Sequence, residues 1–209
     1  MLKLKVFPFN PLQVNAYLIY DLQGAGILID PSCLNHAEFK ELQDFIANNN
    51  ITLNYQLNTH GHFDHVFGTG MVKAAYNPKF LIHQSDESFL IMAGDQARSC
   101  GFEYQGTQPV PDGFLSDMDT ISTGEIHLKV IHVPGHSQGS VAFYEASEGW
   151  LFSGDTLFAG GIGRTDLRGG NYDQIIASIK DRLLTLPSET LVFPGHGPQT
   201  TIGTESPDF

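Results

Sequence analysis

The residues best able to do chemistry gather in one short segment, Thr59-His60-Gly61-His62-Phe63-Asp64-His65. Imidazole nitrogens and carboxylate oxygens are the ligands that zinc and similar divalent metals prefer in proteins. Side chains two positions apart in an extended segment share a face, so His60, His62 and Asp64 are expected to converge. The start of a following helix is expected to turn His65 inward. The alternative is a polar loop in which Asp64 caps that helix.

Three further residues of ligand type share one sequence context. Each follows a short apolar run and a glycine, and they are His136 after Gly135, Asp155 after Gly154 and His196 after Gly195. Glycine lets the backbone bend at the end of a buried strand, so that the next side chain points into a cleft. We therefore expect five histidines and two aspartates to meet at one rim.

Seven protein ligands are too many for one tetrahedral zinc ion, but they suit two metals that share a bridging carboxylate. Two divalent ions about 3.5 to 4 Å apart lower the pKa of a water between them and polarise a substrate oxygen. This predicts hydrolysis near neutral pH. The other four histidines, His36, His83, His127 and His132, are expected to be surface or structural residues.

The elements that must position these residues follow from the spacing of apolar residues and turn signals. The predicted strands lie at 4–9, 14–20, 25–30, around Gln56, and at 80–82, 126–133, 140–145, 149–153 and 190–193. The predicted helices lie at 36–48, 65–76, 85–98 and 172–184. Two groups of strands with helices between and after them favour an α/β (α+β) sandwich. The segment 99–118, which contains Phe102, Tyr104 and Phe114, is expected to be a loop that forms a substrate lid or a dimer contact.

Composition limits the class of protein. Hydrophobic residues make up 41% of the 209 residues and charged residues 16%, which is typical of a globular protein with one domain spanning 1–209. The formal net charge of −12 disfavours nucleic acid and an anionic membrane surface as partners. The first residues lack the apolar core of a signal peptide, which favours the cytoplasm.

The order of these motifs along residues 14–203 resembles that of the metallo-β-lactamase-fold hydrolases. The resemblance implies a four-layer αββα sandwich with a dinuclear metal site. It implies that one metal takes His60, His62 and His136, that the other takes Asp64, His65 and His196, and that Asp155 bridges them. The two divalent ions are expected to be Zn²⁺, with iron or manganese as alternatives.

The segments 157–166 and 194–203 resemble the glyoxalase II-like group, in its short single-domain bacterial form. That group hydrolyses S-lactoylglutathione and related acylglutathiones, and Arg164 falls where it places a basic residue that meets glutathione. Two features depart from the group. No C-terminal helical glutathione-binding domain is expected, and Asp166 stands near the position of an aromatic residue. A salt bridge from Arg164 to Asp166 is the alternative role for this arginine.

The expected function is therefore that of a metal-dependent hydrolase acting on S-lactoylglutathione or a related small acyl thioester. A metal-bridging hydroxide attacks the carbonyl, Asp64 orients it and Asp155 fixes the metal separation. A thiol with a pKa near 8.5 leaves with little help from an acid.

Three alternatives remain at this point. A persulfide dioxygenase of the same fold, which the Gly-Arg-Thr-Asp stretch resembles, uses a single iron on two histidines and one carboxylate. A metal-binding or regulatory module keeps the fold without turnover. Hydrolysis of a β-lactam or a lactone uses the same metals on another carbonyl. The oligomeric state stays open.

Overall fold

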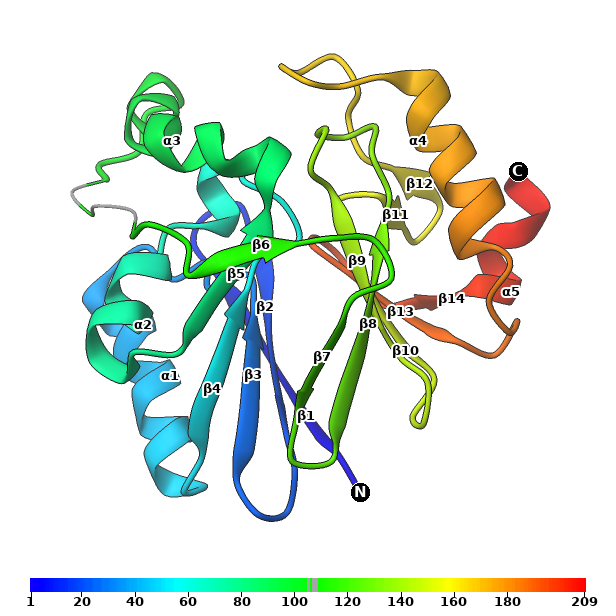
Figure 1. The fold of residues 1–209 in the computed structure, drawn as a ribbon. Helices are drawn as coiled ribbons and strands as arrows, with labels where there is room; N and C mark the ends of the chain where they lie inside the picture. Colours follow the sequence, from blue (N-terminus) through cyan, green and yellow to red (C-terminus); the bar gives the residue numbers. More distant parts are fainter. Residues whose placement is uncertain (105, 107–108) are drawn as a thin grey trace.

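Two six-stranded β-sheets face each other in the computed structural model (Figure 1), which describes residues 1–104, 106 and 109–209 and leaves the side chain of residue 208 undescribed. The first sheet contains, in spatial order, β1 (Lys3–Phe9), β2 (Val14–Tyr20), β3 (Ala25–Ile29), β4 (Thr52–Leu57), β5 (Lys79–His83) and β6 (Gly113–Leu115). The second contains β14 (Thr200–Thr201), β13 (Leu191–Pro194), β10 (Trp150–Gly154), β9 (Val141–Glu145), β8 (Ile126–His132) and β7 (Thr120–Thr123). A ribbon of β11 (Leu157–Phe158) and β12 (Gly161–Ile162) follows β10.

Helices cover the outer face of each sheet (Figure 1). The first sheet carries α1 (His36–Asn48) and α2 (Thr69–Tyr76), and the second carries α4 (Tyr172–Ser178) and α5 (Ile202–Glu205). At one edge of the first sheet lies α3 (Glu87–Ser99). Tighter or wider helical turns complete the chain at η1 (Phe63–His65), η2 (Gln84–Asp86), η3 (Ile179–Leu183) and η4 (Ser206–Asp208). The predicted four-layer αββα sandwich is confirmed.

The main apolar core fills the space between the two sheets. Ile27, Ile29 and Leu57 of the first sheet share one buried cluster with Phe143 and Phe152 of the second. Burying a side chain of this size contributes about 1.5 to 3 kcal/mol. The facing sheets are therefore held rigidly enough for their strand ends to mount a site.

Helix α1 shows why the local predictions hold where the sequence carries start and stop signals. The Asn35 side chain accepts hydrogen bonds from the backbone N–H groups of residues 37 and 38, which caps the first turn. Phe39, Leu42 and Ile46 recur at helical spacing and form its buried face. The helix ends before Asn50, whose φ of +54° cannot continue a helix. The prediction of a helix over 36–48 is confirmed.

Other elements differ from the prediction. The helix expected over 65–76 begins only at Thr69, after the short turn η1. The stretch expected as a loop over 99–118 contains β6, which pairs in parallel with β5. The helix expected over 172–184 changes at Ile179 from α-helical to wider π-helical turns. Strands β7, β11, β12 and β14 and helix α5 were not predicted, because each is short and none contains a run of three apolar residues.

The strand directions bring several chain segments to one edge of the sandwich. Strands β3 and β4 are parallel neighbours in the first sheet, and β10 and β13 are parallel neighbours in the second. The segments after these strands therefore leave from the same edge of each sheet. Among the described residues, no helix combines the length and the apolar character that a membrane crossing requires.

Candidate metal centre

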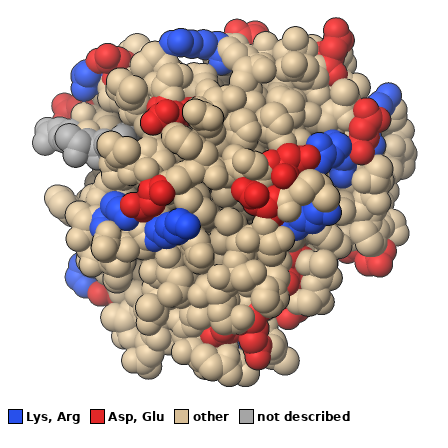
Figure 2. Space-filling model, in the orientation of Figure 1, with Lys and Arg blue, Asp and Glu red and all other residues tan. Residues whose placement is uncertain are grey.

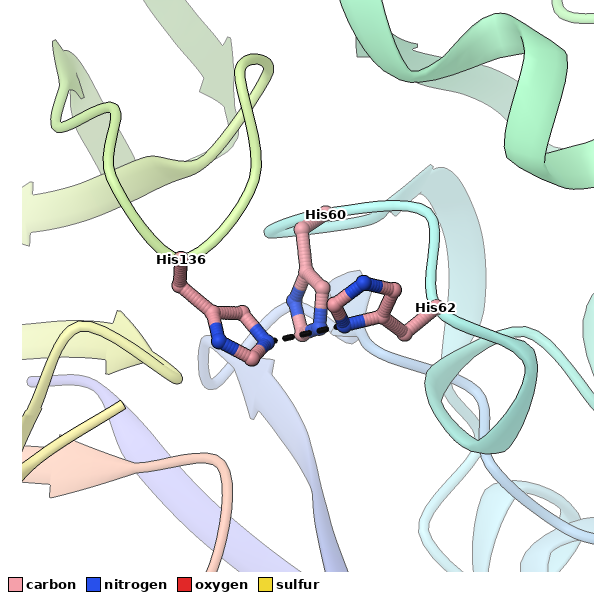
Figure 3. Close-up of side chains that lie close together, drawn as sticks. All are labelled: His60, His62 and His136. Atoms are coloured by element: carbon pink, nitrogen blue, oxygen red, sulfur yellow. Dashed lines mark hydrogen bonds between the residues drawn. The ribbon is translucent and has the colours of Figure 1, made fainter. Parts of the chain in front are cut away.

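Three buried histidines, His60, His62 and His136, form one group of ligand-type side chains, here called the histidine trio. One donor atom from each lies within 4.8 Å of the others, and Nδ1 of His62 lies 2.8 Å from Nε2 of His136. Figure 3 shows the three rings turned toward one another from two separate loops. His60 and His62 follow β4 and His136 follows β8, so both sheets contribute to the group.

The ring of His136 is held by its second nitrogen. Nδ1 lies 2.8 Å from the backbone carbonyl oxygen of Arg164, and since a carbonyl can only accept, Nδ1 donates and Nε2 keeps a free lone pair. Gly135 precedes this histidine with a φ of +139°, and an added Cβ there would overlap the backbone of Ile175. Glycine at 135 is therefore required for helix α4 to pack against this loop.

Asp64, His65 and His196 form a second group, here called the mixed trio, with one donor atom from each within 4.8 Å of the others. Asp64 and His65 belong to η1, and His196 follows β13. Nδ1 of His65 lies 2.9 Å from Oδ2 of Asp30, and Nδ1 of His196 lies 2.9 Å from the backbone carbonyl oxygen of Leu12. These contacts turn both Nε2 atoms toward each other, 3.4 Å apart.

The carboxylate of Asp155 contacts both trios. Oδ1 lies 3.3 Å from Nε2 of His65, and Oδ2 lies 3.6 Å from Nε2 of His136 and also 3.6 Å from Nε2 of His196. An added Cβ at Gly195 would overlap this carboxylate, so glycine there gives the side chain its room. Asp155 is placed where one carboxylate can reach two ions through its two oxygens.

The histidine trio is electrically prepared to bind a cation. Burial, reinforced by the neighbouring His136, lowers the pKa of His62 to about 3. Burial also lowers the pKa of His60 well below its ordinary value, with the other site histidines adding to the effect. Nε2 of His60 is buried and has no hydrogen-bond partner among the described residues. These rings are neutral near pH 7, which is the form that binds metals.

In the mixed trio, neighbouring carboxylates outweigh the effect of burial on the histidine pKa. Burial alone would lower the pKa of His65, but the carboxylates of Asp155, Asp30 and Asp64 raise it well above its ordinary value. Burial alone would raise the pKa of Asp155, but His65 and the other site histidines hold it below its ordinary value. Carboxylates and imidazoles in mutual contact can share a divalent cation in place of protons. The donor set therefore fits two divalent metal ions.

Asp30 is a site residue that the sequence analysis missed. It is 1% exposed, and it accepts hydrogen bonds from the backbone N–H and the hydroxyl of Thr59, both at 2.7 Å, in addition to its contact with His65. It also lies within 4.8 Å of His60 and His65 in a third overlapping group, but its oxygens are occupied by these hydrogen bonds. It directly follows the apolar strand β3, but it lacks the intervening glycine that marked His136, Asp155 and His196.

Asp86 is the second missed residue, and it joins the loops that carry the histidine trio. Oδ2 of this fully buried carboxylate accepts from the Gly61 N–H at 2.9 Å and from the Ser137 hydroxyl at 2.7 Å. Oδ1 accepts from the Gly139 N–H at 2.8 Å. Cβ atoms added at Gly61 or Gly139 would come within 2.8 Å of Asp86 atoms. No local pattern marks this residue, because its partners lie 25 to 53 positions away.

The expected shared face of His60, His62 and Asp64 is wrong in one respect. The chain is extended at His62, where φ is −63° and ψ is 146°, but it turns into η1 at Phe63. Side-chain alternation ends at that turn. Asp64 therefore lies with the mixed trio, while His60 and His62 lie together in the histidine trio.

The four remaining histidines lie outside both trios, as expected. His36 begins α1 and is exposed, and the exposed His127 lies 3.0 Å from the Ser122 hydroxyl. The rings of His83 and His132 stack with centroids 4.4 Å apart. The histidine content is thus divided between the site and ordinary structural positions.

A cavity of about 700 Å³ opens beside both trios and reaches His62, Asp64, His136, Asp155 and His196. Its other walls are largely apolar and include Leu12, Phe63, Phe89, Phe102, Phe158, Ile162 and Leu167. Phe102 thus places the start of the 99–118 segment at this cavity, whereas Tyr104 packs against Phe67 and Phe114 lies on β6. Residues 105, 107 and 108 of that segment lie outside the described residues.

Arg164 lies at the same cavity, but its guanidinium group is already paired. Nε and Nη2 donate to the two carboxylate oxygens of Asp166 at 3.0 and 2.9 Å, and both side chains are about two-thirds exposed. The salt bridge considered as the alternative role is therefore present. Substrate contact by Arg164 stays a prediction.

Comparison with known proteins adds to this geometry. The sequence pattern of the metallo-beta-lactamase superfamily matches residues 9–196. The chain is 36% identical over 205 residues to "Probable metallo-hydrolase YqgX" of Bacillus subtilis, with 98% of this chain and 94% of that protein covered. It is 33% identical over 211 residues to "Hydroxyacylglutathione hydrolase GloC" of Haemophilus influenzae, with 98% and 95% covered.

A solved structure agrees with these sequence relatives. The crystal structure of TTHA1623 in a di-iron-bound form has a TM-score of 0.86 and 37% sequence identity to this chain. The superposition covers 97% of this chain and 96% of that one. The chain belongs to the metallo-beta-lactamase superfamily, whose family pattern spans most of its length.

Proposed function

We propose that this protein is a hydrolase that uses two divalent metal ions to cleave a small acyl thioester of the S-lactoylglutathione type. The observation that carries the proposal is the contact of one carboxylate, Asp155, with both trios at the edge of an apolar cavity. The proposed site needs only the two facing sheets, because each of them contributes part of the ligand set.

The histidine trio would hold one ion, the mixed trio the other, and Asp155 would contact both. Zinc is the first choice for this donor set, and iron or manganese are alternatives. The di-iron form of TTHA1623 supports a site for two metals in a chain of this fold. When bound, two such ions lower the pKa of a water and polarise the oxygen of a carbonyl group.

The chain's own residues then place the reactants. The apolar cavity walls bury the acyl group and exclude bulk water around the thioester carbonyl. Asp64, which lines the cavity, orients the attacking water through its carboxylate. A new bond joins the water oxygen to the carbonyl carbon, the carbon–sulfur bond breaks, and a carboxylic acid and a thiolate leave while one proton of the water passes to solvent. The thiol's pKa near 8.5 makes a dedicated acid for the leaving group unnecessary.

One relative and one sequence segment favour a thioester as the substrate. The name of the GloC relative describes hydrolysis of a hydroxyacylglutathione, and that relative is covered over nearly its whole length. The segment 157–166 also resembles the glyoxalase II-like group. A persulfide dioxygenase with one iron on two histidines and one carboxylate would leave several of the seven assembled ligands without a use.

The test is hydrolysis of S-lactoylglutathione by purified protein of measured metal content, before and after chelation. We expect turnover that depends on about two bound metal ions and disappears when they are removed. Protein that holds two ions but hydrolyses neither this nor other acyl thioesters would contradict the proposed substrate. Oxygen uptake with glutathione persulfide by iron-loaded protein would instead support the dioxygenase.

A further inference from the structure

The cavity beside the two trios carries two cations at its exposed rim, Arg164 and Arg168. Both lie on the connection between β12 and α4. In Figure 1 this connection reaches across the top of the molecule toward α3. The rim is therefore the part of the cavity where charge on a ligand can be recognised.

The two arginines differ in their partners. Arg164 makes two hydrogen bonds to the Asp166 carboxylate, which compensates its charge. No carboxylate oxygen of the described residues forms a salt bridge with Arg168. Nη1 of Arg168 instead lies 2.8 Å from the sulfur of Met92 on α3. A thioether sulfur is a weak acceptor, so this contact leaves the positive charge uncompensated and exchangeable for an anion.

The backbone holds Arg168 in place before any ligand binds. The Gly170 N–H donates to the Leu167 carbonyl oxygen at 2.9 Å, which closes a turn with Arg168 at its second position. Gly169 at the third position has a φ of +83°, a conformation that favours glycine. The Gln138 side chain donates to the Gly169 carbonyl at 2.7 Å and ties this turn to the loop that carries His136. Binding through Arg168 would cost little ordering of the backbone.

The charge of the whole chain makes this position unusual. The net charge is −12, and the Lys and Arg side chains visible in Figure 2 are few and mostly lie beside Asp or Glu side chains. Asp64 and Asp155, the carboxylates that line the cavity, are the candidate metal ligands described above. Arg168 is thus the lining cation left to meet a negative charge on a bound molecule.

The direction of the substrate decides which of its parts meets this cation. In the proposed thioester hydrolysis the carbonyl must reach the trios, so the thiol portion extends toward the rim. A guanidinium group binds a carboxylate through two parallel hydrogen bonds. We propose that Arg168, rather than Arg164, recognises a carboxylate on the thiol portion, so that the substrates are acyl thioesters of small acidic thiols. This inference rests on the proposed function.

The test uses two thioesters that differ by one carboxylate, S-acetyl-N-acetylcysteine and S-acetyl-N-acetylcysteamine. We expect the unaltered enzyme to prefer the acidic thioester in kcat/KM by about five- to tenfold, which lies between the effect of an exposed ion pair and that of a buried charged hydrogen bond. In Arg168→Gln the preference should fall to about one, through a raised KM for the acidic thioester. Arg164→Gln should keep most of the preference. Arg98→Gln, which alters an exposed arginine paired with Asp95, is the control for net charge.

The outcomes separate this inference from the proposed function. Retention of the preference in Arg168→Gln, or its loss in Arg164→Gln, would overturn the role of Arg168 while thioester hydrolysis stands. If neither thioester is hydrolysed, the proposed function fails, and the free thiols decide about Arg168 in a calorimetric titration of the metal-loaded protein. N-acetylcysteine should then bind more tightly than N-acetylcysteamine, and only when Arg168 is present. Equal binding would refute the inference.

Discussion

The two trios of the candidate metal centre are built differently. The histidine trio consists of three imidazole rings that are 1 to 8% exposed, and its loops come from both sheets. The mixed trio includes the carboxylate of Asp64, and the side chain of His196 is 29% exposed at the cavity. One group is made of buried imidazoles alone, whereas the other includes a carboxylate and the more exposed His196, and both contribute side chains to the cavity wall.

Each trio is held by a different buried carboxylate. Asp86 accepts hydrogen bonds from both loops of the histidine trio, through Gly61, Ser137 and Gly139. Asp30 contacts His65 of the mixed trio directly, and it reaches His60 through the Thr59 hydroxyl, which lies 3.0 Å from Nδ1 of that histidine. Loss of Asp86 should therefore disturb one half of the centre, whereas loss of Asp30 should disturb mainly the mixed trio and His60 to a smaller extent.

The largest effect is expected from removing the shared carboxylate. Asp155→Ala should lower the metal content below two ions per chain and reduce thioester hydrolysis by more than about 100-fold, since loss of a mere supporting partner already costs 10- to 100-fold. Elemental analysis and steady-state kinetics measure both. Asp173→Ala, an exposed carboxylate on α4, is the charge-matched control. Near-normal turnover of Asp155→Ala would contradict the shared role.

Asp86 should act on the histidine trio, and Asp30 should act mainly on the mixed trio. Asp86→Asn and Asp30→Asn keep the side-chain size but place an amide N–H₂ against hydrogen-bond donors, and each should weaken binding of one metal by about 10- to 100-fold. Combining each with His136→Ala or His196→Ala assigns the loss. In metal titrations, Asp86→Asn should cause little further loss of metal affinity in the His136→Ala variant but a large further loss in the His196→Ala variant. If the losses of metal affinity add equally in all four double variants, the trios are not held separately.

The glycines beside His136 and His196 differ in the space around them. An added Cβ at Gly135 would overlap the Ile175 backbone, whereas Gly197, with a φ of +76°, has no atom within 4 Å of such a Cβ. Gly135→Ala should lower the free energy of unfolding by about 3 kcal/mol or more. Gly197→Ala should lower it by about 1 to 2 kcal/mol, the cost of a left-handed alanine. Urea unfolding of the metal-free proteins measures both, and equal losses would contradict the described packing.

The smallest effect concerns the order of metal loss. Because His196 is the most exposed of the trio ligands, a chelator should remove the ion of the mixed trio first. Metal release should then follow two phases, and Asp86→Asn should accelerate only the slower one. A single phase in both proteins would show that the difference in exposure does not control release.

The seven candidate ligands could be picked out from the sequence because they lie in local patterns. All seven predicted ligand positions lie beside a strand end or a turn that the apolar runs reveal, and the structure brings their side chains together. The placement of Asp64 could not be predicted by alternation, since the turn η1 depends on packing after Phe63. Asp86 escaped prediction because its partners lie far along the chain.

In the fold, too, elements defined by nearby residues could be predicted, and elements that depend on distant pairing could not. Helix α1 has its cap and its apolar face within its own segment, so its bounds were predicted. Strand β6 is three residues long and exists through its pairing with β5, about 30 positions away, which no local pattern reports. The role of Arg164 shows a further limit, because its pairing with Asp166 is a choice among nearby partners that only geometry decides.

The most direct test of the two-trio centre is a calorimetric titration of metal-free protein with Zn²⁺, with thioester hydrolysis measured at each ratio. Binding should continue to two equivalents per chain, and full hydrolysis should require the second. Saturation at one equivalent, with full activity at that ratio, would contradict a centre of two metal ions.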